Sequence, residues 1–524
     1  TGIALSAARS VVDALSNSIS MAGFTSQLCI LIGLGVGIDY SLFILTRVRA
    51  GLRRGLSPEE AVTTAAATAG RAVLFAGMTV CIALCGMFTV GVSVLSGAAI
   101  AASLAVLFPM AASQTLLPAL IGFLGTRILT RKQRAALEAG EIDPPEASAR
   151  WQRWASRVQA NRLGYGLAAL AIMVALAIPA TSLRLGSADY GTDPTSTSTT
   201  THRAYDLLAS GFGPGFSGPL ELVAPVRSIA QQDTFTQVVS AAGHTSGVAA
   251  VTAPQILPAR SGQPGIAVAQ VYPTGSPQDA STSNLITTLR HRVIPTALHG
   301  QALTVYVGGK TALADDEATQ LSSKLPLFVG MVVALSFLLL LLVFRSLLIP
   351  AVAAVMNLLS AGAAFGVITA VFEKGWLDSL VGVSRTGPIQ PLVPILMFAV
   401  LFGLSMDYEV FLVSRIHEEW LKTRDNARAV NHGQAVTGRT ITALAIIMVV
   451  VFAAFTLTTD RTIKLIGLGM ATAILVDALI VRTVLVPAVM HTLGSANWRL
   501  PRWLERHMPH LDIESTPEPA EATR

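Results

Sequence analysis

Charged residues are scarce in this chain. Asp, Glu, Lys and Arg make up 13% of its 524 residues, whereas 52% are hydrophobic and the mean hydropathy is +0.59. Soluble proteins carry about 25% charged residues, so the composition excludes an ordinary soluble protein and predicts a polytopic membrane protein. The net charge of +6 comes largely from short basic loops beside apolar runs, as the positive-inside rule expects. It therefore does not indicate nucleic-acid binding.

Cysteine is nearly absent as well. Cys29, Cys81 and Cys85 lie within or beside apolar runs, where a cysteine usually acts as a small core residue. The polar block at residues 183–323 contains none. A disulfide framework is therefore excluded for that block.

Nucleotide-binding motifs are also missing. The glycines Gly33, Gly35 and Gly37 imitate a dinucleotide fingerprint, but no βαβ unit surrounds them. The sequence 309–311 ends like a phosphate loop, but the required first glycine is Thr304. We expect no cofactor, no metal and no enzymatic activity.

Long apolar runs dominate instead and predict about nine full spans after an N-terminal stub. A basic linker interrupts them, and its tryptophans could place it on lipid headgroups. A polar block and a polar tail complete the chain. The divisions are a first set of spans (1–125), the linker (126–161), a single span (162–182), an α/β porter domain (183–323), a second set of spans (324–494) and the tail (495–524).

The basic loops predict the orientation. Four arginines follow the first complete span (Arg47, Arg49, Arg53 and Arg54) and mark a cytoplasmic end. A helix should begin there after Ser57, because Ser57 and Glu60 have the spacing of a capping box. The alternation of such loops places the 183–323 domain outside the plasma membrane and the C-terminus in the cytoplasm.

The polar block has the pattern of a ferredoxin-like domain. Its predicted order is β-α-β-β-α-β. The segments are strand Pro219–Val223, helix Ile229–Ala242, strand Val248–Thr252, strand Ile266–Tyr272, helix Ala280–Arg292 and strand Leu303–Val307.

The two sets of spans share an internal repeat. Asp39-Tyr40 in the first matches Asp407-Tyr408 in the second at an offset of 368 residues, and Arg71 matches Arg439 at the same offset. This predicts a parallel repeat with its coupling site at the repeat interface. It also predicts a further outer domain and further spans upstream of Thr1.

The duplicated acids are the strongest functional candidates. Asp407 lies eight residues before Arg415, about 12 Å inside a charged end and near the bilayer midplane. A buried carboxylate there is costly and marks a functional site by default. Neighbouring helix positions point about 100° apart, so an Asp cannot bond the Tyr next to it face-on, but it could accept a hydrogen bond from the Tyr of the other repeat. The pairs could relay protons or could only lock two helices together.

Asp477 is a third acid within the membrane and could couple to the relay. Arg482 follows five residues later. Five residues turn an α-helix by about 140°, so the two should not pair directly. A structural polar contact for Asp477 is the alternative. Phe43 and Phe411 lie one turn from the duplicated acids and could serve as packing or as a gate.

Four short segments carry a resemblance to a known family, namely Gly35–Tyr40, Gly403–Leu412, Phe212–Gly215 and Trp498–Pro501. Their sequences are similar to those of the MmpL branch of the resistance-nodulation-division (RND) superfamily. The resemblance implies an RND-like helical bundle with two periplasmic porter domains and proton-driven export of lipids or other lipophilic molecules. It also implies that Asp39, Tyr40, Asp407 and Tyr408 form the proton relay.

We therefore expect an α-helical polytopic membrane protein that acts as a secondary transporter. Its partners would be a lipophilic or lipid substrate, protons and membrane lipids, and an oligomer is possible. Two alternatives use the same spans, namely a sterol-sensing-like lipid receptor and a protein-translocation accessory. Proton-coupled flux of a small hydrophobic compound would separate the transporter from both.

Overall fold

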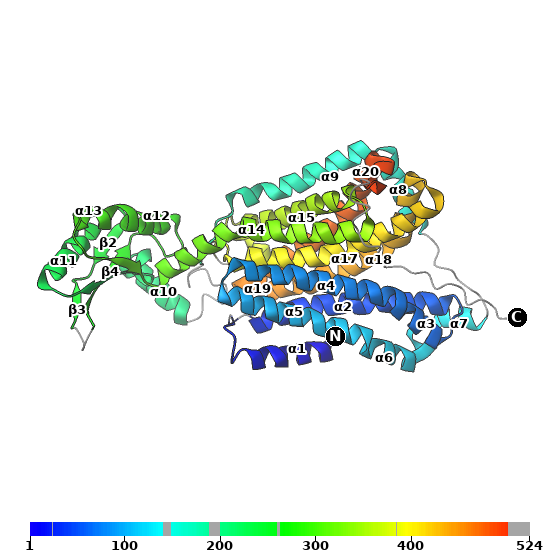
Figure 1. Cartoon of the computed structure of the whole chain (residues 1–524), viewed down its shortest axis with the longest axis horizontal. Helices are drawn as coiled ribbons and strands as arrows, with labels where there is room; N and C mark the ends of the chain where they lie inside the picture. Colours follow the sequence, from blue (N-terminus) through cyan, green and yellow to red (C-terminus); the bar gives the residue numbers. More distant parts are fainter. Residues whose placement is uncertain are drawn as a thin grey trace.

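A computed structural model describes residues 1–21, 23, 25–139, 148–187, 200–258, 263–383 and 385–500. The helices form an elongated bundle, and an α/β domain stands at one end of it (Figure 1). Within the described residues, nine helices are long and apolar enough to cross a membrane. The predicted spans are thereby confirmed. Pro144, Pro145 and the predicted tail beyond Leu500 lie outside the described residues.

The first repeat begins with the predicted stub, which is helix α1 (Gly2–Leu15). The Ser57–Glu60 capping box is confirmed at the start of α3. Pro118 lacks an N–H and its ring clashes with the carbonyl of Gln114, so the third span is broken at Thr115. The other elements are α2 (Thr25–Arg53), α3 (Pro58–Ala65), η1 (Ala66–Gly70), α4 (Arg71–Cys85), η2 (Gly86–Val90), α5 (Ser93–Gln114), α6 (Leu116–Leu124) and η3 (Gly125–Ile128).

The linker forms two short helices, α7 (Arg131–Glu138) and α8 (Ala149–Ala160). Helix α8 packs against α18, because Trp151 fills the space beside Gly438 and Trp154 donates a hydrogen bond into the bundle. Contact of the linker with lipid headgroups stays a prediction. The single span follows as α9 (Arg162–Ala177) and η4 (Ile178–Ser182), with Asn161 capping its first turn.

The α/β domain has the predicted ferredoxin-like order. Its antiparallel sheet runs β2-β4-β1-β5, and a short extra strand, β3, pairs with β4. Strands β1 and β4 alternate between buried and more exposed residues, and Phe235 of α11 is fully buried in the core beneath them. The elements are α10 (Thr200–Phe212), η6 (Pro214–Ser217), β1 (Leu220–Val226), α11 (Ile229–Gly243), β2 (Val248–Val251), β3 (Gln255–Leu257), β4 (Gly265–Pro273), α12 (Ala280–Thr288), η7 (Leu289–Val293), α13 (Ile294–Leu298) and β5 (Tyr306–Gly308).

The second repeat starts with α14 (Lys310–Phe344), one continuous helix that leads from β5 into the bundle (Figure 1). Helix α17 (Leu392–Thr423) is the central helix, and all its residues from Leu392 to Met406 are buried. The remaining elements are α15 (Leu348–Phe372), α16 (Asp378–Val381), α18 (Asn426–Ala454), η8 (Phe455–Leu457), α19 (Arg461–Val476), η9 (Asp477–Leu485), α20 (Val486–Leu493) and η10 (Gly494–Trp498).

Helices of the two repeats pack directly against one another, α17 against α4 and α18 against α2. Small residues allow the close approach. A Cβ atom added to Gly403 of α17 would come within 2.7 Å of the Val80 side chain on α4. This is the small-residue packing that brings helix backbones together in membranes. The interface between the repeats therefore lies in the middle of the bundle, where the Asp-Tyr motifs are.

Candidate proton-relay site

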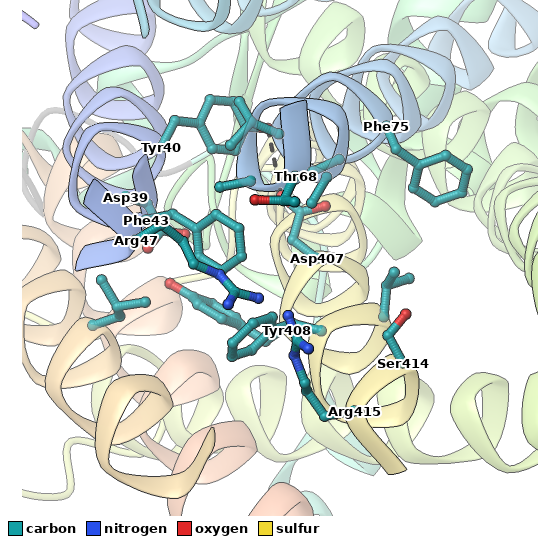
Figure 2. A pocket seen from close by; sticks show the side chains of 17 residues that line it. Asp39, Tyr40, Phe43, Arg47, Thr68, Phe75, Asp407, Tyr408, Ser414 and Arg415 are labelled. Atoms are coloured by element: carbon teal, nitrogen blue, oxygen red, sulfur yellow. Dashed lines mark hydrogen bonds between the residues drawn. The ribbon is translucent and has the colours of Figure 1, made fainter. Parts of the chain in front are cut away.

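The structure brings the two Asp-Tyr motifs together at this interface. Asp39 and Tyr40 lie on α2, and Asp407 and Tyr408 on α17. The Tyr40 hydroxyl donates a hydrogen bond of 3.4 Å to Asp407 Oδ2 (Figure 2). The predicted bond between helices is thus confirmed for this pair. It is a long hydrogen bond by ordinary criteria.

The second pair is different. The Tyr408 hydroxyl and Asp39 Oδ1 are buried, and neither makes a hydrogen bond of ordinary geometry within the described residues. Asp407 Oδ1 makes none either. Tyr408 and Asp39 nevertheless lie close enough to interact, so the predicted second contact is present in a weaker form than the Tyr40–Asp407 bond. Buried polar atoms without partners are rare in folded proteins and call for a specific explanation.

A cavity adjoins all four residues. Its volume is about 70 Å³, counted as the space open to the centres of water-sized spheres. One water needs about 10–15 Å³ on this measure, so several could fit. Phe43 and Phe411 line the cavity and contact each other edge to face, with ring centroids 4.9 Å apart. They serve as packing and as part of the cavity wall.

Two arginines at equivalent positions of the repeat, Arg47 and Arg415, also line the cavity (Figure 2). Arg415 forms an ion pair of 2.6 Å with Glu418. Sequence reasoning used Arg47 only as a sign of orientation and missed its place in the cavity wall. The spacing of each arginine from its acid, eight residues in both repeats, was the signal that could have indicated it.

Asp477 and Arg482 do pair, and the prediction that they would not was wrong. Arg482 Nε donates to Asp477 Oδ2 at 2.7 Å, and both residues are buried. The reason is that Asp477–Leu485 is a π-helix. Its hydrogen bonds join residues i and i+5, so two residues five apart lie on one face. The prediction had assumed α-helical geometry.

Arg482 connects this ion pair to the central helix. It donates to the carbonyl oxygen of Ser405 and, at 3.0 Å, to Ser405 Oγ. Ser405 Oγ donates in turn to Asn357 Oδ1 at 2.6 Å. The guanidinium also lies over the Tyr408 ring, 5.1 Å from its centroid, within the usual range of a cation–π contact. The Asp477–Arg482 pair therefore contacts Tyr408 of the second Asp-Tyr motif.

Sequence reasoning missed three polar residues of this region. Ser405 and Asn357 looked like ordinary small residues of apolar helices, and no periodic signal marks them. Glu409 directly follows the Asp407-Tyr408 motif and is only 5% exposed. Its position inside an apolar run was a usable signal, since acids within spans are functional candidates by default.

These features define a multi-pass membrane protein with a duplicated helical bundle and acids buried at the interface of its repeats. The family model of the MMPL family matches residues 1–162 and 225–512, and the chain belongs to this family. The resemblance noted from the sequence is thereby confirmed.

Three relatives illustrate the relationship. The chain is 36% identical to Membrane protein YdfJ of Bacillus subtilis, over 96% of this chain and 66% of that protein. It is 34% identical to the Mycolic acid-containing lipids exporter MmpL11 of Mycolicibacterium smegmatis, over 96% of this chain and 52% of that protein. It is 35% identical to the Heme uptake protein MmpL11 of Mycobacterium tuberculosis, over 96% of this chain and 51% of that protein. The chain thus spans about half to two thirds of the length of these relatives.

Proposed function

We propose that this chain belongs to a secondary transporter of the plasma membrane that exports a lipid or another lipophilic compound at the expense of the proton gradient. Asp39, Tyr40, Asp407 and Tyr408 form its proton relay, and Asp477 couples to it. The protein is a transporter and not an enzyme. One observation carries the proposal: acids from two repeats meet beside a cavity large enough for several waters, inside a bundle of apolar helices.

Proton uptake at this site would change the contact between the repeats. An ionised Asp407 can only accept a hydrogen bond, as it does from Tyr40, whereas a protonated Asp407 can also donate one. Tyr40 and Asp407 lie on helices of different repeats. A change in their hydrogen bond on protonation of Asp407 therefore changes a contact between the repeats. The unpartnered oxygens of Asp39 and Asp407 leave acceptor sites open for a proton or a water.

One continuous helix joins the α/β domain to the bundle. Helix α14 runs without a break from Lys310, beside the last strand, to Phe344 and packs against α17 and α4. Near its start lies a cavity of about 450 Å³ between the domain and the bundle. Both charged and apolar side chains line it, among them Arg184, Ile286 and Leu465. Ligand pockets commonly occupy about 300–1,000 Å³, and this mixture of side chains suits an amphipathic cargo.

The orientation is part of the proposal. The end of the bundle that holds the basic C-terminal part of α2 faces the cytoplasm, together with the C-terminus, and the α/β domain stands outside. The arginines of Arg47–Arg54 support this assignment, because positive charge accumulates on the cytoplasmic side.

Flux measurements test the proposal. The protein that contains this chain is reconstituted in vesicles, and movement of a labelled lipid is followed after an acid–base jump, with and without a protonophore. We expect lipid flux that stops when the protonophore collapses the gradient. A heme-loaded arm is included because one relative is named a heme uptake protein. Ligand binding without flux would favour a lipid receptor, and gradient-dependent protein movement would favour a translocation accessory.

A further inference from the structure

A second pocket lies at the end of the bundle away from the α/β domain, where four of the described spans begin or end (Figure 1). Its walls come from the junction of α8 and α9, the end of α17, the start of α18 and the end of α20. Its volume is about 430 Å³, and ligand pockets commonly occupy about 300–1,000 Å³. It shares no lining residue with the cavity beside the Asp-Tyr motifs.

The pocket stands at the membrane boundary. The span formed by α9 and η4 runs from Arg162 to Ser182, which is 21 residues. A helix of this length covers about 30 Å, the thickness of the hydrocarbon core, so its two ends lie at opposite boundaries. Arg162 lines the pocket, and Leu163 and Leu167, which follow it on α9, are largely exposed. The pocket therefore lies at the level of the lipid headgroups, beside an apolar helix surface.

The pocket carries a net positive charge. Its charged lining residues are Arg162, Arg424 and one acid, Asp425. Asp425 Oδ1 accepts hydrogen bonds from two backbone N–H groups at the start of α18 and so caps that helix. Arg162 Nη1 donates to the His491 carbonyl at 2.9 Å, which holds the guanidinium at the pocket wall. A guanidinium has five N–H donors, so this bond leaves others for an anion.

Arg424 is held by its backbone and by an aromatic stack. It ends α17 with a φ of +55°, a left-handed conformation in which glycine is usual. Its guanidinium lies over the Trp420 ring, 5.9 Å from the centroid, and Trp420 stacks on Trp498. Trp498 Nε1 in turn donates to Asn426 Oδ1 at 3.1 Å. An arginine in this conformation costs backbone strain, which favours a role for its side chain.

The pocket wall also contains a buried polar atom that lacks a partner. His491 lines the pocket and is only 5% exposed, and its Nε2 makes no hydrogen bond within the described residues. Such an atom in a folded protein calls for an explanation, for example an ion or a water that binds beside it. A bound phosphate and its waters would supply one here.

We propose that this pocket binds the phosphate of an anionic phospholipid, with Arg162 and Arg424 on the phosphate and the acyl chains along Leu163 and Leu167. Arginine binds phosphate through paired N–H donors, and basic pockets between spanning helices on the cytoplasmic side bind lipid headgroups. A soluble phosphate compound shares this chemistry, but the apolar surface of α9 beside the pocket favours a lipid. The proposal does not depend on transport, and the orientation of the chain decides only which leaflet supplies the lipid.

Lipid binding to the whole protein that contains this chain tests the proposal. The protein is delipidated in detergent and studied by native mass spectrometry. Phosphatidylglycerol, phosphatidylcholine and glycerol 3-phosphate are added in separate arms. We expect phosphatidylglycerol to bind more tightly than phosphatidylcholine, whose headgroup has no net charge, and glycerol 3-phosphate to bind weakly. Equal binding of the two lipids, or tighter binding of glycerol 3-phosphate, would overturn the proposed lipid site.

Three arginine variants locate the binding. Arg424→Gln and Arg162→Gln should each weaken phosphatidylglycerol binding about 10-fold, the effect of one hydrogen bond to a charged group. Arg153→Gln removes the same charge from an exposed position on α8, outside the pocket, where Arg153 Nε donates to the Ala149 carbonyl of its own helix. It should bind the lipid as the wild type does.

Wild-type affinity in both pocket variants, or an equal loss in Arg153→Gln, would contradict the site. Arg162→Gln also removes the bond to the His491 carbonyl and could unfold the protein. In that case Arg424→Gln decides, because the Arg424 side chain is exposed and its stacking partners remain.

Discussion

Tyr40 and Asp407 are 367 residues apart in the chain, and the hydroxyl of the first donates a hydrogen bond to the carboxylate of the second. This bond crosses the interface of the two repeats near the middle of the bundle. The reciprocal pair, Tyr408 and Asp39, interacts without reaching ordinary hydrogen-bond geometry within the described residues. Two copies of one motif therefore make contacts of unequal strength at this interface.

The asymmetry predicts unequal effects of two matched substitutions. Tyr40→Phe removes the hydrogen bond to Asp407, worth roughly 0.5–1.5 kcal/mol net, and should lower flux per inserted molecule about 2- to 10-fold. Tyr408→Phe removes a hydroxyl whose contact with Asp39 is weaker, and it should have a smaller effect. Both variants should be inserted at wild-type levels. Equal losses, or a larger loss for Tyr408→Phe, would contradict the asymmetric arrangement.

The Asp477–Arg482 pair predicts a separation of stability from function. Asp477→Leu alone leaves Arg482 buried without its counter-charge, and breaking a buried pair in this way costs about 3–5 kcal/mol. The thermal stability of the purified protein should fall markedly. The double variant Asp477→Leu/Arg482→Met removes both charges and should regain much of that stability. It should still transport poorly, because no cation lies over Tyr408. Recovery of both properties would show that the pair is only structural.

Helix packing at the repeat interface predicts a sharp difference between two glycines. In Gly403→Ala the new methyl group would meet Val80 of α4, and overpacking of this kind costs about 1–3 kcal/mol. Gly330 on α14 has open space where its Cβ would stand, so Gly330→Ala should leave thermal stability unchanged or slightly raise it. Equal melting temperatures for the two variants would contradict the close approach of α17 and α4.

The proposed orientation is tested with single cysteines in a background without Cys29, Cys81 and Cys85. A cysteine at Asp233, which is exposed on α11 of the α/β domain, should react with a membrane-impermeant maleimide added to whole cells. A cysteine at Arg54, beside the end of α2, should react only after lysis. The reverse pattern would invert the topology.

The spans, the α/β order and the meeting of the Asp-Tyr motifs could all be predicted from the sequence. Apolar runs have few alternatives in a membrane, because only closed hydrogen-bonded structures can span it. The repeat identified Asp39 and Asp407 as equivalents and so predicted their interface. Neither inference required knowledge of individual side-chain contacts.

The sequence-based expectations departed from the structure at two places, and in both the cause was an assumption of regular geometry. The separation of Asp477 and Arg482 was calculated from a constant helical twist, and the π-helix before Pro487 changes that twist locally. Equal Tyr–Asp bonds were expected from repeat symmetry. Equivalent backbones do not enforce equivalent contacts: Arg482 lies over the Tyr408 ring, whereas the position 368 residues earlier is Gln114, which carries no charge.

The most direct test of the proton relay is flux through Asp39→Asn and Asp407→Asn, measured per inserted molecule in vesicles under an imposed proton gradient. Asparagine nearly keeps the shape and hydrogen-bonding capacity of aspartate, but its side-chain amide does not take up a proton at the pH values of the assay. Insertion should remain near normal, because neutralising a buried acid relieves a cost of a few kcal/mol. The relay predicts that each variant abolishes proton-driven flux. Wild-type flux from the Asp407→Asn protein would contradict it.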